Sequence, residues 1–309
     1  MPNSFYLKDI LSIKEFSRED LECLFKNADK IKSMDMKEKI EIAKGKLLGF
    51  VFYEPSSRTK ISFETAMLTI GGHCTGITDT STSSIEKGEN LADTISTISG
   101  YTDAIVLRHP LEGAARFAAE VSNKPVINAG SGTEEHPTQA MIDLYTMYKE
   151  KGKIDGLKIG IMGDLRYGRT VYSLLYALSK FSTKISLISP QELRLRENTL
   201  LDIRETTKWD EYEKVEEIIQ DLDVLYVTRI QKERFPDPSE YQKVKDSYFV
   251  DKTLLEKASS NIIVLHPLPR IEEIRHEVDS LPQAKYFIQA HLGKDLRSAL
   301  LGLLFNADL

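Results

Sequence analysis

Short apolar runs alternate with longer amphipathic stretches along this chain. The stretches that indicate strands lie at residues 50–53, 73–78, 104–107, 125–128, 158–162, 184–188, 224–227 and 262–265, and those at 50–53, 104–107 and 262–265 indicate buried strands. Between most of them, apolar residues recur at helical spacing. Strands that alternate with helices favour parallel sheets joined by right-handed crossovers. The fold class is therefore predicted to be α/β.

Local patterns predict three further elements. Ser17 precedes apolar residues at helical spacing and has Asp20 in the first turn, which predicts a capped helix start. The stretch 209–219 is amphipathic and predicts a helix. Residues 286–289 predict a last strand, before a closing helix over residues 296–305.

The length of the chain predicts two domains. At 309 residues it is long for one hydrophobic core, and about 150 residues per domain is the usual size. We expect a first domain over residues 1–137, with the C-terminal helix 294–309 packing back on it, and a second domain over residues 138–293. Each is expected to be a mostly parallel sheet flanked by helices, with the active site in the cleft between them.

Composition narrows the possible partners. The net charge of -6 and the pI near 5.7 argue against nucleic acid, which is bound by clustered Lys and Arg in excess. No run of about 18 apolar residues occurs, so no membrane partner is expected. The two cysteines are too few for a disulfide framework or a thiolate zinc site, and they indicate a reducing, cytoplasmic location.

A polar turn follows the first apolar run. Pro55 ends the run, and Ser56, Ser57, Arg58 and Thr59 then open a helical pattern. Backbone N–H groups at a helix start form an anion site, to which hydroxyls and a guanidinium add donors and positive charge. The same residues would also serve as an ordinary serine N-cap beside a solvated arginine. The turn alone does not decide between these readings.

Other candidate residues stand just past the ends of apolar runs. In open α/β sheets, ligands bind outside the carboxyl ends of the strands. If two such sheets face each other, one space is surrounded by Ser56–Thr59, Arg108, His136, Arg169, Arg229 and His266–Pro269. Any one of these groups could simply be a polar residue on a solvated loop. That explanation is less attractive for the whole set, because all of its members follow strand ends.

The candidate residues indicate an oxyanion ligand. Guanidinium groups match carboxylate and phosphate in shape and charge. The glycines at 160, 163 and 168 lack the spacing of a dinucleotide-binding turn, so a nucleotide-dependent dehydrogenase is disfavoured. The sequence also lacks a metal-ligand cluster and a Ser-His-Asp order, so no metal or cofactor is expected. The chemistry expected is positioning and electrostatic stabilisation.

Five motifs resemble the aspartate/ornithine carbamoyltransferase family. Residues 52–64 (FYEPSSRTKISFE) are similar to its carbamoyl phosphate signature, and residues 136–139 (HPTQ) to its second signature. In the second half, residues 163–170 (GDLRYGRT), 228–234 (TRIQKER) and 266–270 (HPLPR) resemble the aspartate-specific members. Ornithine-specific members would carry Cys where this chain has Pro267. The likeness spans nearly the whole chain.

The resemblance implies roles for the residues of the first half. Those that would hold carbamoyl phosphate are Ser56, Ser57, Arg58, Thr59, Arg108, His136 and Gln139. Thr59, Arg108 and His136 would also donate to the carbamoyl oxygen, and these three with Arg58 are the expected catalytic set. Gln139 would orient the carbamoyl amide. Glu54 and Arg234 look like family residues that pair with site arginines when the domains close.

The resemblance also implies an aspartate site and a trimer. Arg169 would bind the α-carboxylate of L-aspartate, and Arg229 with Gln231 the β-carboxylate. The backbone carbonyls of Pro267 and Leu268 would accept from the carbamoyl amide beside the aspartate. Lys87 would also bind the aspartate, and it would come with Ser83 from the neighbouring subunit of a homotrimer with shared active sites. The family further includes members that bind a separate regulatory chain.

The implied activity is carbamoyl transfer from carbamoyl phosphate to the α-amine of L-aspartate, giving N-carbamoyl-L-aspartate and phosphate in de novo pyrimidine biosynthesis. The alternative within the family is transfer to ornithine or another amine, which phosphate release with ornithine would favour. From another class, the chain could be a catalytically silent module that binds a small phosphorylated anion. An absence of turnover on any amine would favour that reading.

Overall fold

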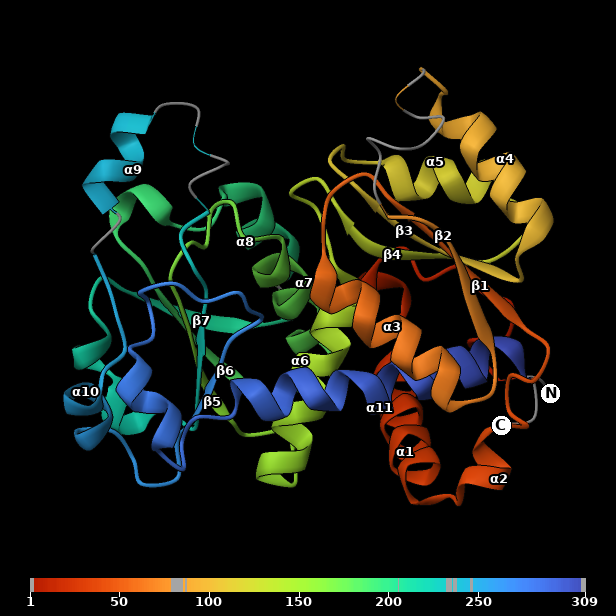
Figure 1. Cartoon of the computed structure of the whole chain (residues 1–309). Coiled ribbons are helices and arrows are strands. Elements are labelled where there is room, and N and C mark those ends of the chain that lie inside the picture. The colour runs from red at the N-terminus through yellow and green to blue at the C-terminus, as the bar shows by residue number, and fades with distance from the viewer. Residues whose placement is uncertain are drawn as a thin grey trace. The chain divides into compact units, whose positions relative to one another are not determined.

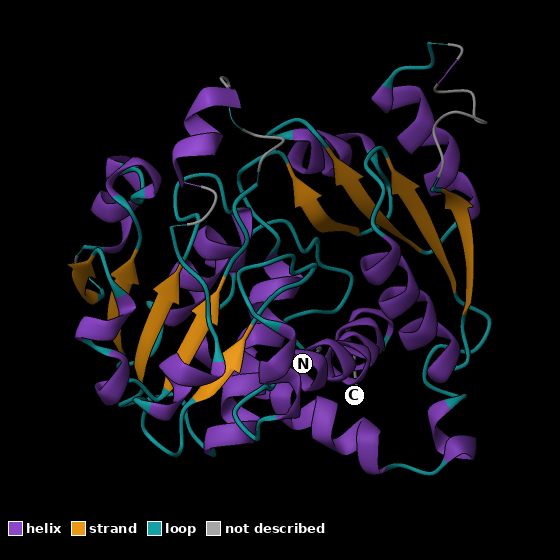
Figure 2. Ribbon diagram, turned by 60° about the vertical axis from the view of Figure 1, so that its left-hand side comes forward, coloured by secondary structure: helices purple, strands orange, loops and turns teal. Residues whose placement is uncertain are grey.

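The computed structural model describes residues 3–78, 86, 88–204, 206–231, 235, 238–244 and 247–306. The chain divides into two compact units: residues 1–141 with 291–309, and residues 142–290. Each unit contains one sheet of parallel strands with helices beside it, and the arrowheads within each sheet point the same way (Figure 2). The prediction of an α/β fold with two parallel sheets is confirmed.

The first unit has a four-stranded sheet in the order β2-β1-β3-β4 (Figure 1). Its strands are β1 (Leu47–Phe52), β2 (His73–Ile77), β3 (Ala104–His109) and β4 (Val126–Ser131). Its helices are α1 (Arg18–Ser33), α2 (Met36–Lys39), α3 (Ser57–Thr69), α4 (Leu91–Tyr101) and α5 (Ala114–Val121). Ile95 of α4 and Ala118 of α5 pack against Val51, Ile105 and Leu107 of the sheet. Helices α4 and α5 therefore cover one face, and β1, β3 and β4 are buried, whereas the edge strand β2 is largely exposed.

The second unit has a five-stranded sheet in the order β7-β6-β5-β8-β9. Its strands are β5 (Lys158–Met162), β6 (Lys184–Ile188), β7 (Lys208–Tyr212), β8 (Val224–Val227) and β9 (Ile263–Leu265). Its helices are α7 (Arg169–Leu178), α8 (Glu197–Ile203), α9 (Pro238–Val244) and α10 (Lys252–Glu256). Two helices carry the chain from one unit to the other, α6 (Pro137–Lys151) and α11 (Tyr286–Phe305).

Two of the predicted elements are wrong. Residues 209–212, placed in a helix, belong to β7 (Lys208–Tyr212), which pairs with β6 through Ile185 and Trp209. Pairing at a free sheet edge prevailed there over a weak helical pattern. Residues 286–289, placed in a strand, begin α11. Tyr286 and Gln289 are buried while Phe287 and Ile288 are exposed, which is the spacing of a helix face rather than of a strand.

The predicted cap at the start of α1 is confirmed. The Ser17 side chain accepts from the Asp20 N–H at 3.1 Å, and the Asp20 carboxylate accepts from the Ser17 N–H at 2.8 Å. The two bonds satisfy backbone donors that the helix itself leaves unpaired. A Ser17→Ala variant should lose about 1 kcal/mol of unfolding free energy without a change in turnover. Urea unfolding monitored by circular dichroism measures the loss, and an unchanged midpoint would contradict it.

Candidate functional site

The candidate residues of the first unit follow neighbouring strands at the switch point of its sheet. Strand β1 lies between β2 and β3, so the strand order reverses beside β1. The turn Ser56–Thr59 follows β1, and Arg108 lies near the end of β3, paired in register with Phe52. A switch point is where ligands bind in open α/β sheets.

The anion turn does not have the geometry of a serine N-cap. Ser56 occupies the N-cap position of α3, but its side chain makes no capping hydrogen bond. It donates instead to the Thr59 hydroxyl, at 3.0 Å. Ser57 and Arg58 are exposed while Thr59 is buried. The hydroxyls and the guanidinium thus stand at a helix start whose dipole favours an anion, and the simpler cap reading is not supported.

Arg108 is held by its neighbours in the first unit. One guanidinium nitrogen, Nη1, donates to the Ala129 carbonyl at 3.1 Å, and Nη2 lies 3.4 Å from the Glu54 carboxylate. The Tyr53 N–H also donates to the Arg108 carbonyl, at 2.8 Å. These contacts fix the end of β3 to the anion turn. Glu54, expected to pair with a site arginine, is paired here with Arg108.

His136 and Gln139 lie at the start of α6, after the turn that follows β4. The His136 carbonyl accepts from the Gln139 N–H at 2.9 Å, so both residues belong to the first helical turn. His136 is buried and Gln139 is half-buried. The preceding turn is fastened by a bridge between Ser131 and Glu135. The first unit therefore supplies candidate donors from β1, β3 and the turn after β4, three neighbouring strands.

Helix α6 is anchored beside these donors by a buried arginine of α11. Arg297 is 4% exposed, lies 4.5 Å from the centre of the Phe63 ring and donates to the Thr138 hydroxyl at 3.3 Å. Ser298 of the same helix donates to the Ala66 carbonyl at 3.3 Å. The second half of α11 thus packs on α3 and α6 within the first unit.

The candidate residues of the second unit also gather at a switch point. Strand β5 lies between β6 and β8, so the strand order reverses beside β5. Arg169 is the first residue of α7, after the β5 turn, and is buried. Arg229 and Gln231 follow β8, and Pro267 and Leu268 follow β9. The three strand ends are neighbours, and two of them carry arginines.

Asp164 connects the turn after β5 to the segment after β8, a role that the sequence did not reveal. Its carboxylate is fully buried and accepts from the Tyr167 N–H at 2.9 Å and from the Gln231 N–H at 3.2 Å. Burial raises the pKa of this carboxyl, while the backbone bonds and Arg229 oppose the rise. Gln231 also donates to the Tyr167 carbonyl at 3.1 Å. An aspartate directly after a strand-ending glycine was the only local signal.

Gly163 lets the two segments approach this closely. Its φ is +125°, and a Cβ there would lie 2.3 Å from the Thr228 carbonyl oxygen. The Thr228 hydroxyl accepts from the Asp164 N–H at 3.1 Å, and the Tyr248 hydroxyl donates to the Thr228 carbonyl at 2.9 Å. The glycine therefore serves backbone packing, in agreement with the absence of a dinucleotide-binding spacing.

The structure brings the predicted residues together within each unit: Ser56, Ser57, Arg58, Thr59, Arg108, His136 and Gln139 in the first, and Arg169, Arg229, Gln231, Pro267 and Leu268 in the second. Ser83, Lys87 and Arg234 lie outside the described residues. Within the described ranges, no group of three or more His, Cys, Asp or Glu side chains could hold a metal ion. In the same ranges, no helix is long and apolar enough to cross a membrane.

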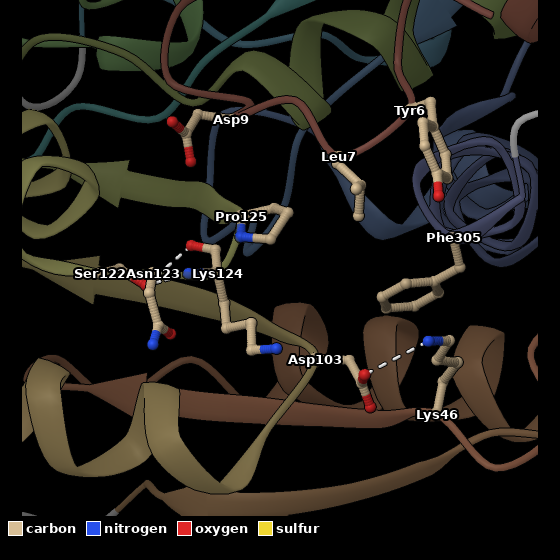
Figure 3. A pocket seen from close by; sticks show the side chains of 10 residues that line it. All are labelled: Tyr6, Leu7, Asp9, Lys46, Asp103, Ser122, Asn123, Lys124, Pro125 and Phe305. Atoms are coloured by element: carbon tan, nitrogen blue, oxygen red, sulfur yellow. Dashed lines mark hydrogen bonds and ion pairs between the residues drawn. The ribbon is translucent and has the colours of Figure 1, made fainter. Parts of the chain in front are cut away.

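A cavity of about 470 Å³ lies at the amino ends of the strands of the first sheet, whereas the candidate residues follow the carboxyl ends (Figure 3). Lys46, Asp103 and Pro125 line it directly before β1, β3 and β4, and Phe305 lines it from the end of α11. Lys46 and Asp103 form an ion pair at 3.3 Å on one side of it (Figure 3). None of the candidate residues lines this cavity, so it is separate from the strand ends that carry the anion turn.

Family models match both halves of the chain. Residues 8–149 match "Aspartate/ornithine carbamoyltransferase, carbamoyl-P binding domain", and residues 155–304 match "Aspartate/ornithine carbamoyltransferase, Asp/Orn binding domain". The aspartate carbamoyltransferase catalytic subunit of Nitrosopumilus maritimus is 60% identical over 306 residues, which cover 99% of each chain. That of Methanocaldococcus jannaschii is 50% identical over 298 residues, which cover 96% of this chain and 97% of the relative.

Solved structures agree with these matches. The catalytic subunit of M. jannaschii aspartate transcarbamoylase has a TM-score of 0.88 at 50% identity, covering 96% of this chain and 97% of the other. Aspartate transcarbamoylase from Trypanosoma cruzi, in complex with carbamoyl phosphate and aspartate, has a TM-score of 0.94 at 36% identity and 98% coverage of both chains. Because family models, relatives and structures agree over both units, the chain belongs to the aspartate/ornithine carbamoyltransferase family.

Proposed function

We propose that this chain transfers the carbamoyl group of carbamoyl phosphate to the α-amine of L-aspartate, giving N-carbamoyl-L-aspartate and phosphate, a step of pyrimidine biosynthesis. The observation that carries the proposal is the placement of one donor set at the switch point of each sheet. The carbamoyl-P match covers the first set and the Asp/Orn match covers the second. The aspartate subunits among the relatives favour aspartate over ornithine.

The first unit would hold carbamoyl phosphate. In this proposal the phosphate binds at the start of α3, where Ser56, Ser57, Arg58 and Thr59 offer hydroxyl, guanidinium and backbone donors. Arg108 adds charge, and His136 and Gln139 contact the carbamoyl group. We place the carbamoyl phosphate-binding domain at residues 1–137 with helix 294–309 and the aspartate-binding domain at residues 138–293, with Gln139 reaching the carbamoyl group from the start of the second.

The second unit would hold L-aspartate. Arg169 is assigned to the α-carboxylate, and Arg229 with Gln231 to the β-carboxylate, because guanidinium forks match carboxylates. The Asp164 bonds support this assignment, since they hold the Gln231 backbone to the turn that precedes Arg169. The carbonyls of Pro267 and Leu268 would accept from the carbamoyl amide.

The reaction needs charge stabilisation and no cofactor. The uncharged α-amine of aspartate attacks the carbamoyl carbon, and the carbonyl oxygen gains negative charge as the tetrahedral intermediate forms. Thr59, Arg108 and His136 donate to that oxygen, a contribution that typically accounts for the largest share of such catalysis. The C–O bond to phosphate then breaks, the carbonyl reforms, and phosphate leaves with the proton that the amine releases.

The decisive experiment compares amine acceptors. The purified chain is incubated with carbamoyl phosphate and either L-aspartate or L-ornithine, and phosphate and ureido product are measured together. We expect equal amounts of phosphate and N-carbamoyl-L-aspartate with aspartate, and neither product above background with ornithine. Ornithine turnover would replace the proposed substrate, and no turnover with any amine would leave only an anion-binding module.

We further propose a cytoplasmic homotrimer in which Ser83 and Lys87 complete the site of the neighbouring subunit. The free cysteines Cys23 and Cys74 fit a reducing compartment. The trimer and the shared loop that carries Ser83 and Lys87 are proposed from the resemblance to the family. A separate regulatory chain, present in part of the family, would be an additional partner and would appear as a second chain that co-purifies with the native enzyme.

Shared sites predict recovery of activity on mixing inactive variants. Lys87→Ala chains retain Arg58, and Arg58→Ala chains retain Lys87, so each mixed trimer contains a site with both native residues. We expect turnover to appear only after the two variants are dissociated and reassembled together. As a matched control, Arg58→Ala mixed with Arg108→Ala should stay inactive, because both changes damage the same half of the site. Equal recovery in both mixtures, or none in either, would refute shared sites.

A further inference from the structure

The loop after β9 is fixed by one buried imidazole. His266 is 1% exposed, and its two ring nitrogens face different partners. Nδ1 accepts from the Leu268 N–H at 2.8 Å, and Nε2 lies 2.8 Å from the Glu273 carboxylate. Because a backbone N–H can only donate, Nδ1 must keep its lone pair, and the ring proton lies on Nε2. His266 is therefore a neutral imidazole that donates to Glu273.

The charges around the ring agree with this tautomer. Burial lowers the pKa of His266, which favours the neutral ring. The pKa of Glu273 is lowered although burial opposes it, chiefly because His266 donates to its carboxylate. The second Glu273 oxygen accepts from the Ile271 N–H at 3.1 Å. The carboxylate is thus ionised and holds both His266 and the far end of the loop.

A buried hydrogen-bond chain holds the backbone of His266 as well. The His266 N–H donates to the Gln289 side-chain oxygen at 2.8 Å, and the Gln289 amide nitrogen donates to Asp143 at 2.7 Å. The other oxygen of Asp143 accepts from the Tyr226 hydroxyl at 2.9 Å. These hydrogen bonds connect β8, α6, α11 and the loop after β9, and all four residues belong to the second unit. The backbone and the imidazole of His266 are therefore both held by buried partners.

We propose that His266 is a positioning residue that sets the direction of the Pro267 carbonyl. The Pro267 carbonyl and the Leu268 N–H belong to one planar trans peptide, in which the two groups point in opposite directions. An N–H held on the buried imidazole therefore turns the carbonyl away from the core, toward the side where a ligand donor can reach it. Leu268 itself has a φ of +56°, a conformation that a branched residue adopts only when its surroundings impose it.

This inference rests on the proposed function, because it assigns the carbonyl an amide N–H of carbamoyl phosphate as its partner. Ser56–Thr59 hold the phosphate, whereas the loop would contact only the carbamoyl end. A misdirected carbonyl would thus weaken the use of carbamoyl phosphate and leave the binding of inorganic phosphate unchanged. This difference separates a positioning role from a general loss of structure.

Two substitutions test the roles of the two ring nitrogens separately. In His266→Asn the side-chain oxygen occupies the place of Nδ1, so the acceptor for Leu268 is kept and the donor to Glu273 is lost. In His266→Gln the amide reaches the place of Nε2, so the donor to Glu273 is kept and the acceptor is lost. We expect kcat/KM for carbamoyl phosphate to stay near that of the unmodified chain in the Asn variant and to fall about 100-fold in the Gln variant.

A purely structural role gives the opposite order, because only the Asn variant leaves the buried Glu273 charge without its donor. Inhibition by inorganic phosphate should be unchanged in both variants, and His291→Gln, which alters an exposed histidine, should behave as the unmodified chain. If His266→Asn fails to fold, both variants are compared on a Glu273→Gln background, with the same order expected. A Gln variant as active as the Asn variant would overturn the proposal.

A structural readout keeps the two hypotheses distinct. A crystal structure of the unliganded Gln variant should show the Pro267–Leu268 peptide rotated, and that of the Asn variant should show it unchanged. This result does not depend on which amine is carbamoylated. If the unmodified chain had no transferase activity, the proposed function would fail while the peptide geometry could still be tested. An unrotated peptide in the Gln variant would refute the positioning role by itself.

Discussion

Replacing Arg58 with alanine should weaken carbamoyl phosphate binding about 1,000-fold and leave the fold intact. Truncating one partner of a hydrogen-bonded charge pair costs about 2–5 kcal/mol, and each 1.4 kcal/mol is a factor of ten. Arg58 is exposed in the first turn of α3, so its removal takes nothing from the core. Isothermal titration with carbamoyl phosphate measures the loss, and thermal unfolding shows whether the fold is kept.

A nearby lysine provides the matched control. Lys60 lies on the same helix and pairs with Glu64 at 3.5 Å. Lys60→Ala removes the same charge, and we expect binding close to that of the unmodified chain. Arg58→Lys should fall between the two alanine variants, because an ammonium keeps the charge but not the planar fork. Near-normal affinity of Arg58→Ala would place the phosphate elsewhere.

The positions of the candidate residues in the fold could be predicted because the signals that place them are local. Apolar runs predicted β1, β3, β5 and β8, and each run ends where the chain turns polar. Parallel strands bring their carboxyl ends to one edge, so Arg108 could be placed beside the turn after β1 without knowledge of side-chain contacts. The strand order that makes each edge a switch point required the structure.

The hydrogen-bond partners of the candidate residues could not be predicted, because they depend on distant segments or on side-chain geometry that no local pattern encodes. Asp164 accepts from the N–H of Gln231, 67 positions away, and no local pattern signals that bond. The imidazole of His266 contacts Leu268 and Glu273, but which nitrogen carries the proton follows only from the geometry of both. The Ser56–Thr59 bond settled a choice between a serine cap and an anion turn that the sequence left open.

The two wrong elements show how tertiary context changes local preference. Residues 208–212 have charges on both faces, and only pairing with β6 makes them a strand. Residues 286–289 combine aromatic and branched side chains, which favour strands. They are nevertheless helical, because Tyr286 and Gln289 contact the interior together at a spacing of three positions. Strand pairing at the sheet edge decided the first case and burial of one helix face decided the second, and the sequence reveals neither.

Replacing Arg229 with alanine should reduce kcat/KM for L-aspartate about 1,000-fold, because the β-carboxylate would lose its charged partner. L-Asparagine tests the cause, since it has the same shape without the charge. With the unmodified chain, aspartate should be the far better acceptor. With Arg229→Ala, the two should become nearly equal. The coupling between the change in the enzyme and the change in the substrate then isolates the interaction of the two charges.

The matched control removes an arginine whose partners are known. Arg194 of the second unit pairs with Glu211 and Glu213 on the surface, at 3.7 and 3.4 Å. Exposed pairs of this kind contribute about 0–1 kcal/mol to stability, so Arg194→Ala should keep both the turnover and the preference for aspartate. An unchanged preference in Arg229→Ala would assign the β-carboxylate to another group. Loss of turnover with both acceptors alike would instead give Arg229 a role in the chemical step.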